Sequence, residues 1–102
     1  MIYCREDLEL GGYRLRRHIF RPESGTPIRG SAFHFHGQGD FAGRYGKFLQ
    51  PFWEKGIVCV ATDLPGHGHS HGIRGHVPGF EIVDRVAESN RTRCRELVKD
   101  DD

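Results

Sequence analysis

The sequence lacks the long apolar run, the charge imbalance and the cysteine spacing that mark several classes of protein. No apolar stretch in its 102 residues approaches the roughly 20 residues of a membrane-spanning helix, and residues 1–7 lack the apolar segment of a signal peptide. The formal net charge is +1, too small for the broad basic field of a charge-driven nucleic-acid binder. We therefore expect no membrane span and no nucleic-acid partner.

The cysteines are few and widely spaced. Cys4, Cys59 and Cys94 form no CxxC pair, and an odd set of this kind fits neither a disulfide framework nor a cysteine zinc site. We expect reduced thiols and a cytoplasmic protein, with Cys59 buried in its apolar surroundings. Glycine is abundant in contrast: 14 residues, about twice the usual share of ~7%, indicate many tight turns.

Hydrophobic periodicity predicts an antiparallel hairpin, then a βαβ unit, then a last helix. In chain order we expect a hairpin around Gly11-Gly12, a strand over 28–36, a helix over 45–53 that is kinked or restarted at Pro51, a strand over 57–63 and a helix that opens at Phe80. The run over 57–63 is nearly all apolar and largely β-branched, which is typical of a strand buried on both faces of a parallel sheet.

The second arm of the hairpin alternates between two faces. Leu15, Arg17 and Ile19 share a largely apolar face, whereas Arg16 and His18 share a charged one, and we expect this strand near a sheet edge. The fold class is therefore α/β. Because a completed sheet would continue with a further strand after the last helix, residues 1–102 are expected to be an incomplete part of such a domain.

The first candidate site is His36-Gly37-Gln38-Gly39, directly after one predicted strand and before a helix. Glycines there let the backbone turn sharply and leave amide N–H groups free to stabilise an oxyanion, an effect worth roughly 10²–10³ in rate per donor. An ordinary strand-to-helix turn explains the same spacing equally well.

The second candidate site is the glycine- and histidine-rich segment after residue 62. Asp63, Gly66, His67, Gly68 and Ser70 are interpreted as a structural turn held by hydrogen bonds from side chain to backbone. The segment 68–72 also matches G-x-S-x-G, the pattern of a nucleophile elbow. An elbow needs an apolar strand directly before its first glycine and a helix directly after its serine, and neither is predicted here. Ser70 is therefore a weak candidate nucleophile.

Seven histidines raise the possibility of a metal site. His34 and His36 alternate on a strand, and His67, His69 and His71 alternate in the glycine-rich loop. Neither group has a carboxylate at a typical ligand spacing, so we expect no specific metal site and no cofactor. A histidine-rich metal-binding protein remains the third of three functional hypotheses.

Several linked motifs together resemble one family. They are His36-Gly37-Gln38-Gly39-Asp40, Arg44-Tyr45, Asp63-Leu64-Pro65-Gly66-His67-Gly68-His69-Ser70 and Arg74-Gly75-His76-Val77-Pro78. In order and spacing the chain resembles roughly the N-terminal third of α/β-hydrolases, most closely the monoacylglycerol lipase and lysophospholipase branch, which is serine aminopeptidase-like. It departs from that branch at Asp40-Phe41, where Glu-His is usual, and at Pro65, where Arg is usual.

The resemblance implies a serine hydrolase that acts by acyl transfer on a small ester or lipid substrate. It implies that the backbone N–H of Gln38 lines the oxyanion hole, with His36, Gly37 and Gly39 shaping the loop. The serine, aspartate and histidine of the triad are expected beyond Asp102, after a nucleophile-elbow strand that these residues do not include, so this chain alone is expected to be inactive. The alternative is a non-catalytic interaction module of the same half-fold, associating through the open edge of the strand over 28–36.

Overall fold

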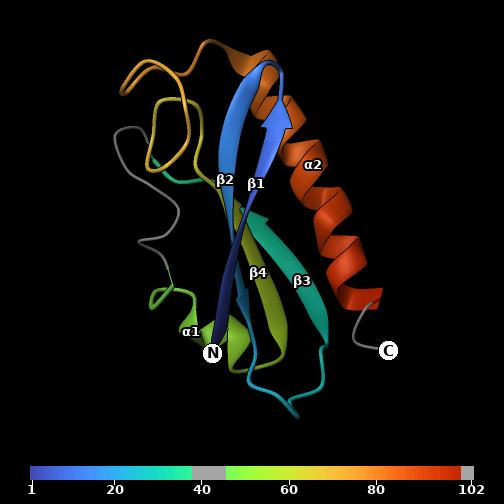
Figure 1. Cartoon of the computed structure of the whole chain (residues 1–102). Coiled ribbons are helices and arrows are strands. Elements are labelled where there is room, and N and C mark those ends of the chain that lie inside the picture. Colours follow the sequence, from blue (N-terminus) through green and yellow to red (C-terminus); the bar gives the residue numbers. More distant parts are fainter. Residues whose placement is uncertain (38–45, 100–102) are drawn as a thin grey trace.

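The computed structural model describes residues 1–37 and 46–99 of the chain. In chain order the elements are β1 (Ile2–Leu10), β2 (Tyr13–Arg21), β3 (Gly30–His34), α1 (Gln50–Trp53), β4 (Ile57–Thr62) and α2 (Phe80–Lys99) (Figure 1). The four strands form one sheet in the spatial order β1-β2-β4-β3, in which β3 is parallel to β4 and the other neighbours are antiparallel. This mixed sheet with its helices confirms the α/β class. No helix among the described residues is long and apolar enough to cross a membrane.

The predicted hairpin is confirmed. Gly11 and Gly12 form its two-residue turn with φ angles of 57° and 84°. Positive φ at both central residues is what the turns that match the twist of a β-hairpin require, and glycine adopts it without steric cost. The register places Leu8 opposite Leu15, so the alternating apolar residues of the two arms meet on one face.

The predicted buried strand is β4, which ends just before Asp63. Every residue of β4 from Val58 to Thr62 is buried. Helix α2 packs against one face, where Val60 contacts the cluster that contains Leu97. On the other face Cys59 packs with Phe20 and Leu49. Burial on both faces explains the nearly continuous apolar run.

The three cysteines are free thiols, and Cys59 and Cys94 are buried. Burial, reinforced by the neighbouring Cys94, raises the pKa of the Cys59 thiol to about 11. Because the thiolate is the reactive form of cysteine, Cys59 is chemically inert near neutral pH and serves as a small apolar side chain.

The position predicted for the second arm of the hairpin is confirmed: β2 lies next to the edge strand β1, and β4 pairs with its other side from Arg17 to Phe20. Its charged face is nevertheless covered at His18, which is only 3% exposed, and Arg17 on the apolar face is only 6% exposed. Alternation along one strand does not reveal which later segment covers its polar face, and here β4 and the segment that follows it do so.

Strand β3 forms the outer edge of the sheet beyond β4 and is shorter than the predicted strand over 28–36. Its central residue, Ala32, is exposed to solvent. The edge position agrees with the sequence-based expectation, whereas pairing of this edge with a second chain stays a prediction.

The helix predicted over 45–53 is a single turn, α1, within the described residues. Pro51 lies in its first turn, as one of the two sequence-based options required. Leu49 is buried against the sheet, but Phe48 and Phe52 are 72% and 47% exposed. A helix of one turn is too short to place all the apolar residues predicted over 45–53 on one buried face.

Helix α2 is fastened to the sheet by a cluster of polar side chains. The guanidinium of Arg17 donates to Glu6 Oε1 at 2.8 Å and to Asn90 Oδ1 at 3.2 Å. Arg93 of α2 also donates to Glu6 Oε1, at 2.9 Å, and the hydroxyl of Thr62 donates to Asn90 Oδ1 at 2.8 Å. Burial of Glu6 disfavours its charge, but the hydrogen bonds from the two arginines outweigh this and lower the pKa of the carboxyl group.

We predict that Glu6→Gln lowers the free energy of unfolding near neutral pH and flattens its dependence on pH. The pKa of Glu6 is lower in the folded chain than in the unfolded one, so the stabilisation is present above the unfolded pKa and is lost as pH falls through the folded pKa. Urea unfolding at a series of pH values from about pH 7 to about pH 3 measures the slope of the free energy of unfolding against pH.

Glu88→Gln is the matched control for this prediction, because Glu88 is exposed and reaches Arg91 only at 4.0 Å. Its slope should equal that of the wild type within error. Equal slopes for the wild type and Glu6→Gln would show that the cluster around Arg17 does not stabilise the fold.

Candidate functional site

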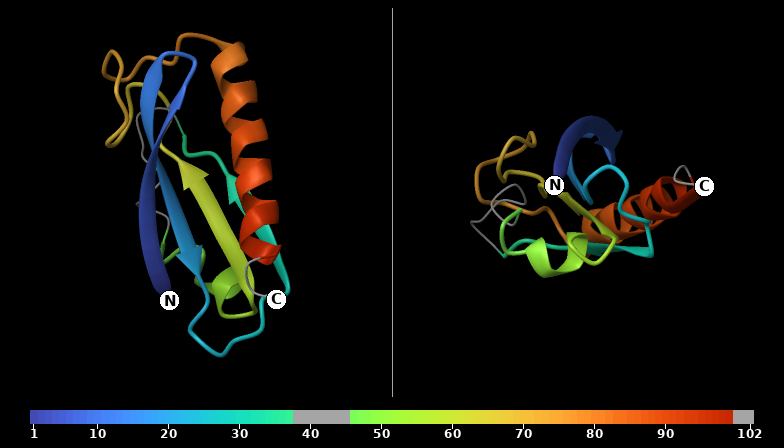
Figure 2. Two further views of the ribbon diagram at one scale, coloured as in Figure 1. Left: turned by 45° about the vertical axis from the view of Figure 1, so that its right-hand side comes forward. Right: turned by 90° about the horizontal axis from the view of Figure 1, so that it is seen from below.

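The two candidate sites lie at the same edge of the sheet. His36 follows β3 and Asp63 follows β4, and since these strands are parallel, both segments leave the sheet at its carboxyl edge. Figure 2 shows the segment after β4, coloured yellow to orange, beyond the end of that strand. In open α/β sheets, ligands bind at this edge.

His36 joins the two segments through its imidazole ring. The ring is buried, and the backbone N–H of Leu64 donates to Nε2 at 2.9 Å. Because Nε2 accepts, the proton of the neutral ring is on Nδ1, which donates to the carbonyl of Gly37 at 2.8 Å. Both ring nitrogens are therefore engaged, and His36 holds the chain after β3 against the chain after β4.

Gln38 and Gly39 lie outside the described residues. The role of the Gln38 amide in an oxyanion hole therefore stays a prediction. The adjoining Gly37 is exposed, and His36 holds its carbonyl oxygen.

The carboxylate of Asp63 is the centre of the second segment. The side chain is fully buried. Its Oδ2 accepts the backbone N–H of His69 at 3.1 Å and the ring N–H of His18 at 3.0 Å. A Cβ atom at Gly68 would lie only 2.4 Å from Oδ2, so the loop passes too close to the carboxylate for any other residue. The φ of Gly68 is also positive, at 50°.

Ser70 is buried, and its hydroxyl group is occupied by backbone partners. Oγ accepts the backbone N–H of Arg16 at 2.8 Å and donates to the carbonyl of Asp63 at 2.5 Å. No histidine forms a hydrogen bond with Oγ among the described residues, and the next helix begins only at Phe80. A serine nucleophile needs a base within hydrogen-bond distance, and Ser70 has backbone atoms there instead.

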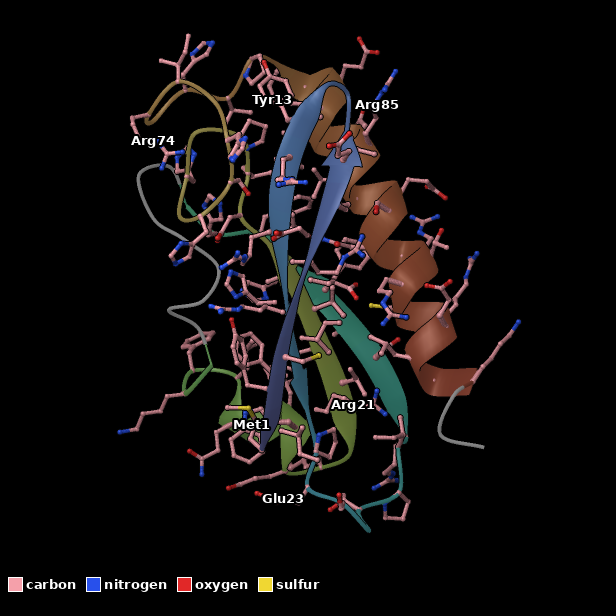
Figure 3. All side chains as sticks on the ribbon, viewed as in Figure 1. Met1, Tyr13, Arg21, Glu23, Arg74 and Arg85 are labelled. Atoms are coloured by element: carbon pink, nitrogen blue, oxygen red, sulfur yellow. The ribbon has the colours of Figure 1, made fainter. Side chains whose placement is uncertain are left out.

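The rest of the loop is closed by further contacts to its backbone. Arg74, labelled in Figure 3, donates to the carbonyls of Gly68 and Ser70. His67 is buried with its Nδ1 3.0 Å from the carbonyl of Pro65. Its ring packs against that of His36 with a centroid separation of 4.8 Å. These contacts make the loop a compact unit attached to the end of the sheet.

Two residues that connect to Asp63 through hydrogen bonds were missed by the sequence analysis. His18 of β2 forms a hydrogen bond with Asp63. The hydroxyl oxygen of Tyr3, in β1, is 2.6 Å from Nδ1 of His18. His18 and Asp63 are separated by 45 positions in the sequence. No local spacing signals such a pair, and the sequence analysis placed His18 with Arg16 on a charged face of the strand.

The histidines do not gather into a ligand set in the part of the chain that the structure describes. No group of three or more His, Cys, Asp or Glu residues there could hold a metal ion. His67 is buried, whereas His69 and His71 are exposed. Burial and the nearby His36 lower the pKa of His34, so its ring is neutral near pH 7.

A cavity of about 450 Å³ lies elsewhere in the molecule. It is bounded by the hairpin turn and the start of α2, where Figure 3 labels Tyr13 and Arg85. Pro78 and Gly79 in its lining end the segment after β4, but none of the lining residues is among the candidate site residues over 36–39 or 63–70. The cavity therefore does not include those residues.

Comparisons with known proteins agree with this arrangement. A family model described as "Serine aminopeptidase, S33" matches residues 26–89. The monoacylglycerol lipase of Mycolicibacterium smegmatis is 37% identical over 68 residues, which are 67% of this chain and 24% of the lipase. The caffeoylshikimate esterase of Arabidopsis thaliana is 34% identical over 84 residues, 79% of this chain and 25% of the esterase. The chain thus spans about a quarter of the length of these relatives.

A solved structure shows the same fold. A soluble variant of monoglyceride lipase from Saccharomyces cerevisiae superposes with a TM-score of 0.76 over 95% of this chain and 33% of the lipase. The sequences are 15% identical, so the likeness concerns the fold alone. Nearly the whole chain therefore corresponds to a third of that larger structure.

We predict that Gly68→Ala destabilises the chain more than Gly75→Ala does. Both glycines have positive φ, so alanine at either position costs about 1 kcal/mol or more in backbone strain. Only at Gly68 does the added methyl group collide with the Asp63 carboxylate, since a Cβ at Gly75 meets nothing within 4 Å. Displacing the carboxylate breaks buried hydrogen bonds and should add about 1–3 kcal/mol.

Thermal or urea unfolding of the two variants and the wild type measures the difference. Gly75→Ala controls for the strain of the left-handed backbone. Equal destabilisation of the two variants would show that the contact between Gly68 and Asp63 does not constrain the loop.

Proposed function

Because this chain belongs to the serine aminopeptidase S33 family of α/β-hydrolases, we propose that it forms the N-terminal part of a serine hydrolase of the esterase or lipase type. The proposed substrates are carboxylic esters, such as monoacylglycerol- or lysophospholipid-like molecules. The names of the relatives, a monoacylglycerol lipase and a caffeoylshikimate esterase, support an ester as the bond that is cleaved. The reaction is acyl transfer to a serine followed by hydrolysis.

The observation that carries this proposal is the position of His36 and Gly37 at the carboxyl end of β3. The parallel pair β3 and β4 brings this segment beside the loop after β4, and the His36 ring bridges the two. In this proposal the backbone N–H of Gln38 faces the oxygen that becomes negative in the tetrahedral intermediate. Gly37 and Gly39 allow the chain to turn there without a side chain in the way.

The proposal divides the catalytic groups between this chain and further polypeptide. This chain supplies the oxyanion-hole loop, whereas the nucleophilic serine, the histidine base and the orienting aspartate come from residues outside 1–102. Ser70 is assigned a structural role, because its hydroxyl hydrogen is directed at the Asp63 carbonyl and not at a base. The chain of 102 residues alone should therefore not catalyse repeated turnover of an ester substrate.

We predict that a fluorophosphonate probe labels a serine outside residues 1–102 in the product of the longest reading frame that contains this sequence. Such probes form a tetrahedral adduct whose oxygen occupies the oxyanion hole. Gln38→Pro removes the amide hydrogen and should slow labelling by about 10²–10³-fold, the loss measured for single oxyanion donors. Mass spectrometry of tryptic peptides locates the adduct, and its appearance with time gives the rate.

Gln38→Ala is the matched control, because it removes the side chain but keeps the backbone N–H. Its labelling rate should stay within a few-fold of the wild type. An adduct on Ser70 would contradict the assignment of the nucleophile. Equal labelling rates for the proline and alanine variants, with both folded by circular dichroism, would contradict the role of the Gln38 amide.

A further inference from the structure

Three polar side chains from three segments form a line on one face of the sheet. Tyr3 comes from β1, His18 from β2 and Asp63 from the end of β4. The hydroxyl oxygen of Tyr3 is 2.6 Å from His18 Nδ1, and His18 Nε2 is 3.0 Å from Asp63 Oδ2. A hydroxyl group, an imidazole and a carboxylate are thus connected in series by hydrogen bonds.

For a neutral His18 ring, the chemistry of the three groups gives the direction of both hydrogen bonds. An ionised carboxylate only accepts, so the proton of the neutral His18 ring lies on Nε2 and is donated to Asp63. The unprotonated Nδ1 then accepts the hydroxyl hydrogen of Tyr3. Both distances fall within the range that joins a nucleophile to its base and the base to its orienting group.

Burial differs along the line in a way that suits a reactive hydroxyl. His18 is 3% exposed and Asp63 is fully buried, so water does not compete for their hydrogen bond. Tyr3 as a residue is 44% exposed, so it is the member of the line that borders solvent. The Tyr3 ring is held by stacking on His18 and by packing on Phe20, at centroid distances of 5.9 and 5.3 Å.

We propose that Tyr3 is the acyl-accepting nucleophile of this chain toward activated esters, with His18 as its general base and Asp63 as the residue that positions His18. This site is distinct from the serine triad of the proposed function, and it does not depend on residues outside 1–102. Its occupant is a small ester with a good leaving group, such as an aryl acetate.

The reaction balances without a further reagent. A lone pair on the Tyr3 oxygen attacks the ester carbonyl carbon, and the phenolic proton passes to His18 Nδ1. With p-nitrophenyl acetate as the ester, the tetrahedral intermediate collapses, the bond from the carbonyl carbon to the aryl oxygen breaks, and p-nitrophenolate leaves. His18 then releases its extra proton to solvent, so the products are O-acetyl-Tyr3 and free p-nitrophenolate.

The electrostatic surroundings of Tyr3 explain why it requires a base. Burial raises the pKa of Tyr3, although the guanidinium groups of Arg5 and Arg16 act in the opposite direction. The hydroxyl group is therefore protonated near neutral pH, and its proton must be removed as the new bond forms. The same two cations favour negative charge on the Tyr3 oxygen as its proton is withdrawn.

The experiment treats the purified chain of 102 residues with p-nitrophenyl acetate and maps acetylated tyrosines by mass spectrometry. Tyr13 serves as an internal reference, because no histidine bonds its hydroxyl group among the described residues. We expect Tyr3 to be acetylated about 10²-fold faster than Tyr13, the lower end of the effect of a general base. His18→Gln should reduce the rate at Tyr3 to that at Tyr13.

Acetylation of Tyr3 within a few-fold of the rate at Tyr13 in the wild-type chain would overturn the proposal, and this comparison needs no variant that could misfold. So would an unchanged rate at Tyr3 in His18→Gln, with folding checked by circular dichroism. Tyr3→Phe should abolish the adduct at position 3 and leave the rate at Tyr13 unchanged. Because the probe reacts with this chain alone, its failure leaves the serine-hydrolase proposal untouched.

Discussion

The buried carboxylate of Asp63 is the constraint on which the structure at the carboxyl edge of β3 and β4 depends. It accepts hydrogen bonds from His18 in the sheet and from the backbone of His69 in the following loop. A buried carboxylate without such partners would cost several kcal/mol, so the loop and the strand are fixed relative to each other by the need to satisfy it. The close passage of Gly68, which excludes any side chain there, follows from the same requirement.

His36 extends that constraint to the neighbouring segment. By accepting from Leu64 and donating to Gly37, it couples the chain after β3 to the loop that Asp63 organises. Neither His36 nor Ser70 has an atom free for proton transfer, so the residues that most resemble catalytic ones in the sequence are used to build the site. In the proposed enzyme, chemistry is left to the backbone amide of Gln38 and to side chains from further polypeptide.

Local sequence patterns predicted the elements whose formation depends on residues close together in the sequence. The Gly11-Gly12 pair specified the hairpin, the apolar run of β4 specified a strand covered on both faces, and the helix opening at Phe80 was found. The burial of His18 could not be predicted, because it depends on Asp63, which is 45 positions away. Likewise, the apolar stripe over 45–53 does not determine how many turns its helix has.

The most direct test of the account is ¹⁵N NMR of the imidazole rings of His18 and His36 near neutral pH. Opposite tautomers are expected in one protein: His18 protonated on Nε2, where it donates to Asp63, and His36 protonated on Nδ1, where it donates to Gly37. Nitrogen shifts and couplings to the ring protons distinguish the two forms. The same tautomer in both rings, or rapid averaging in either, would contradict the claim that these histidines hold the two loops.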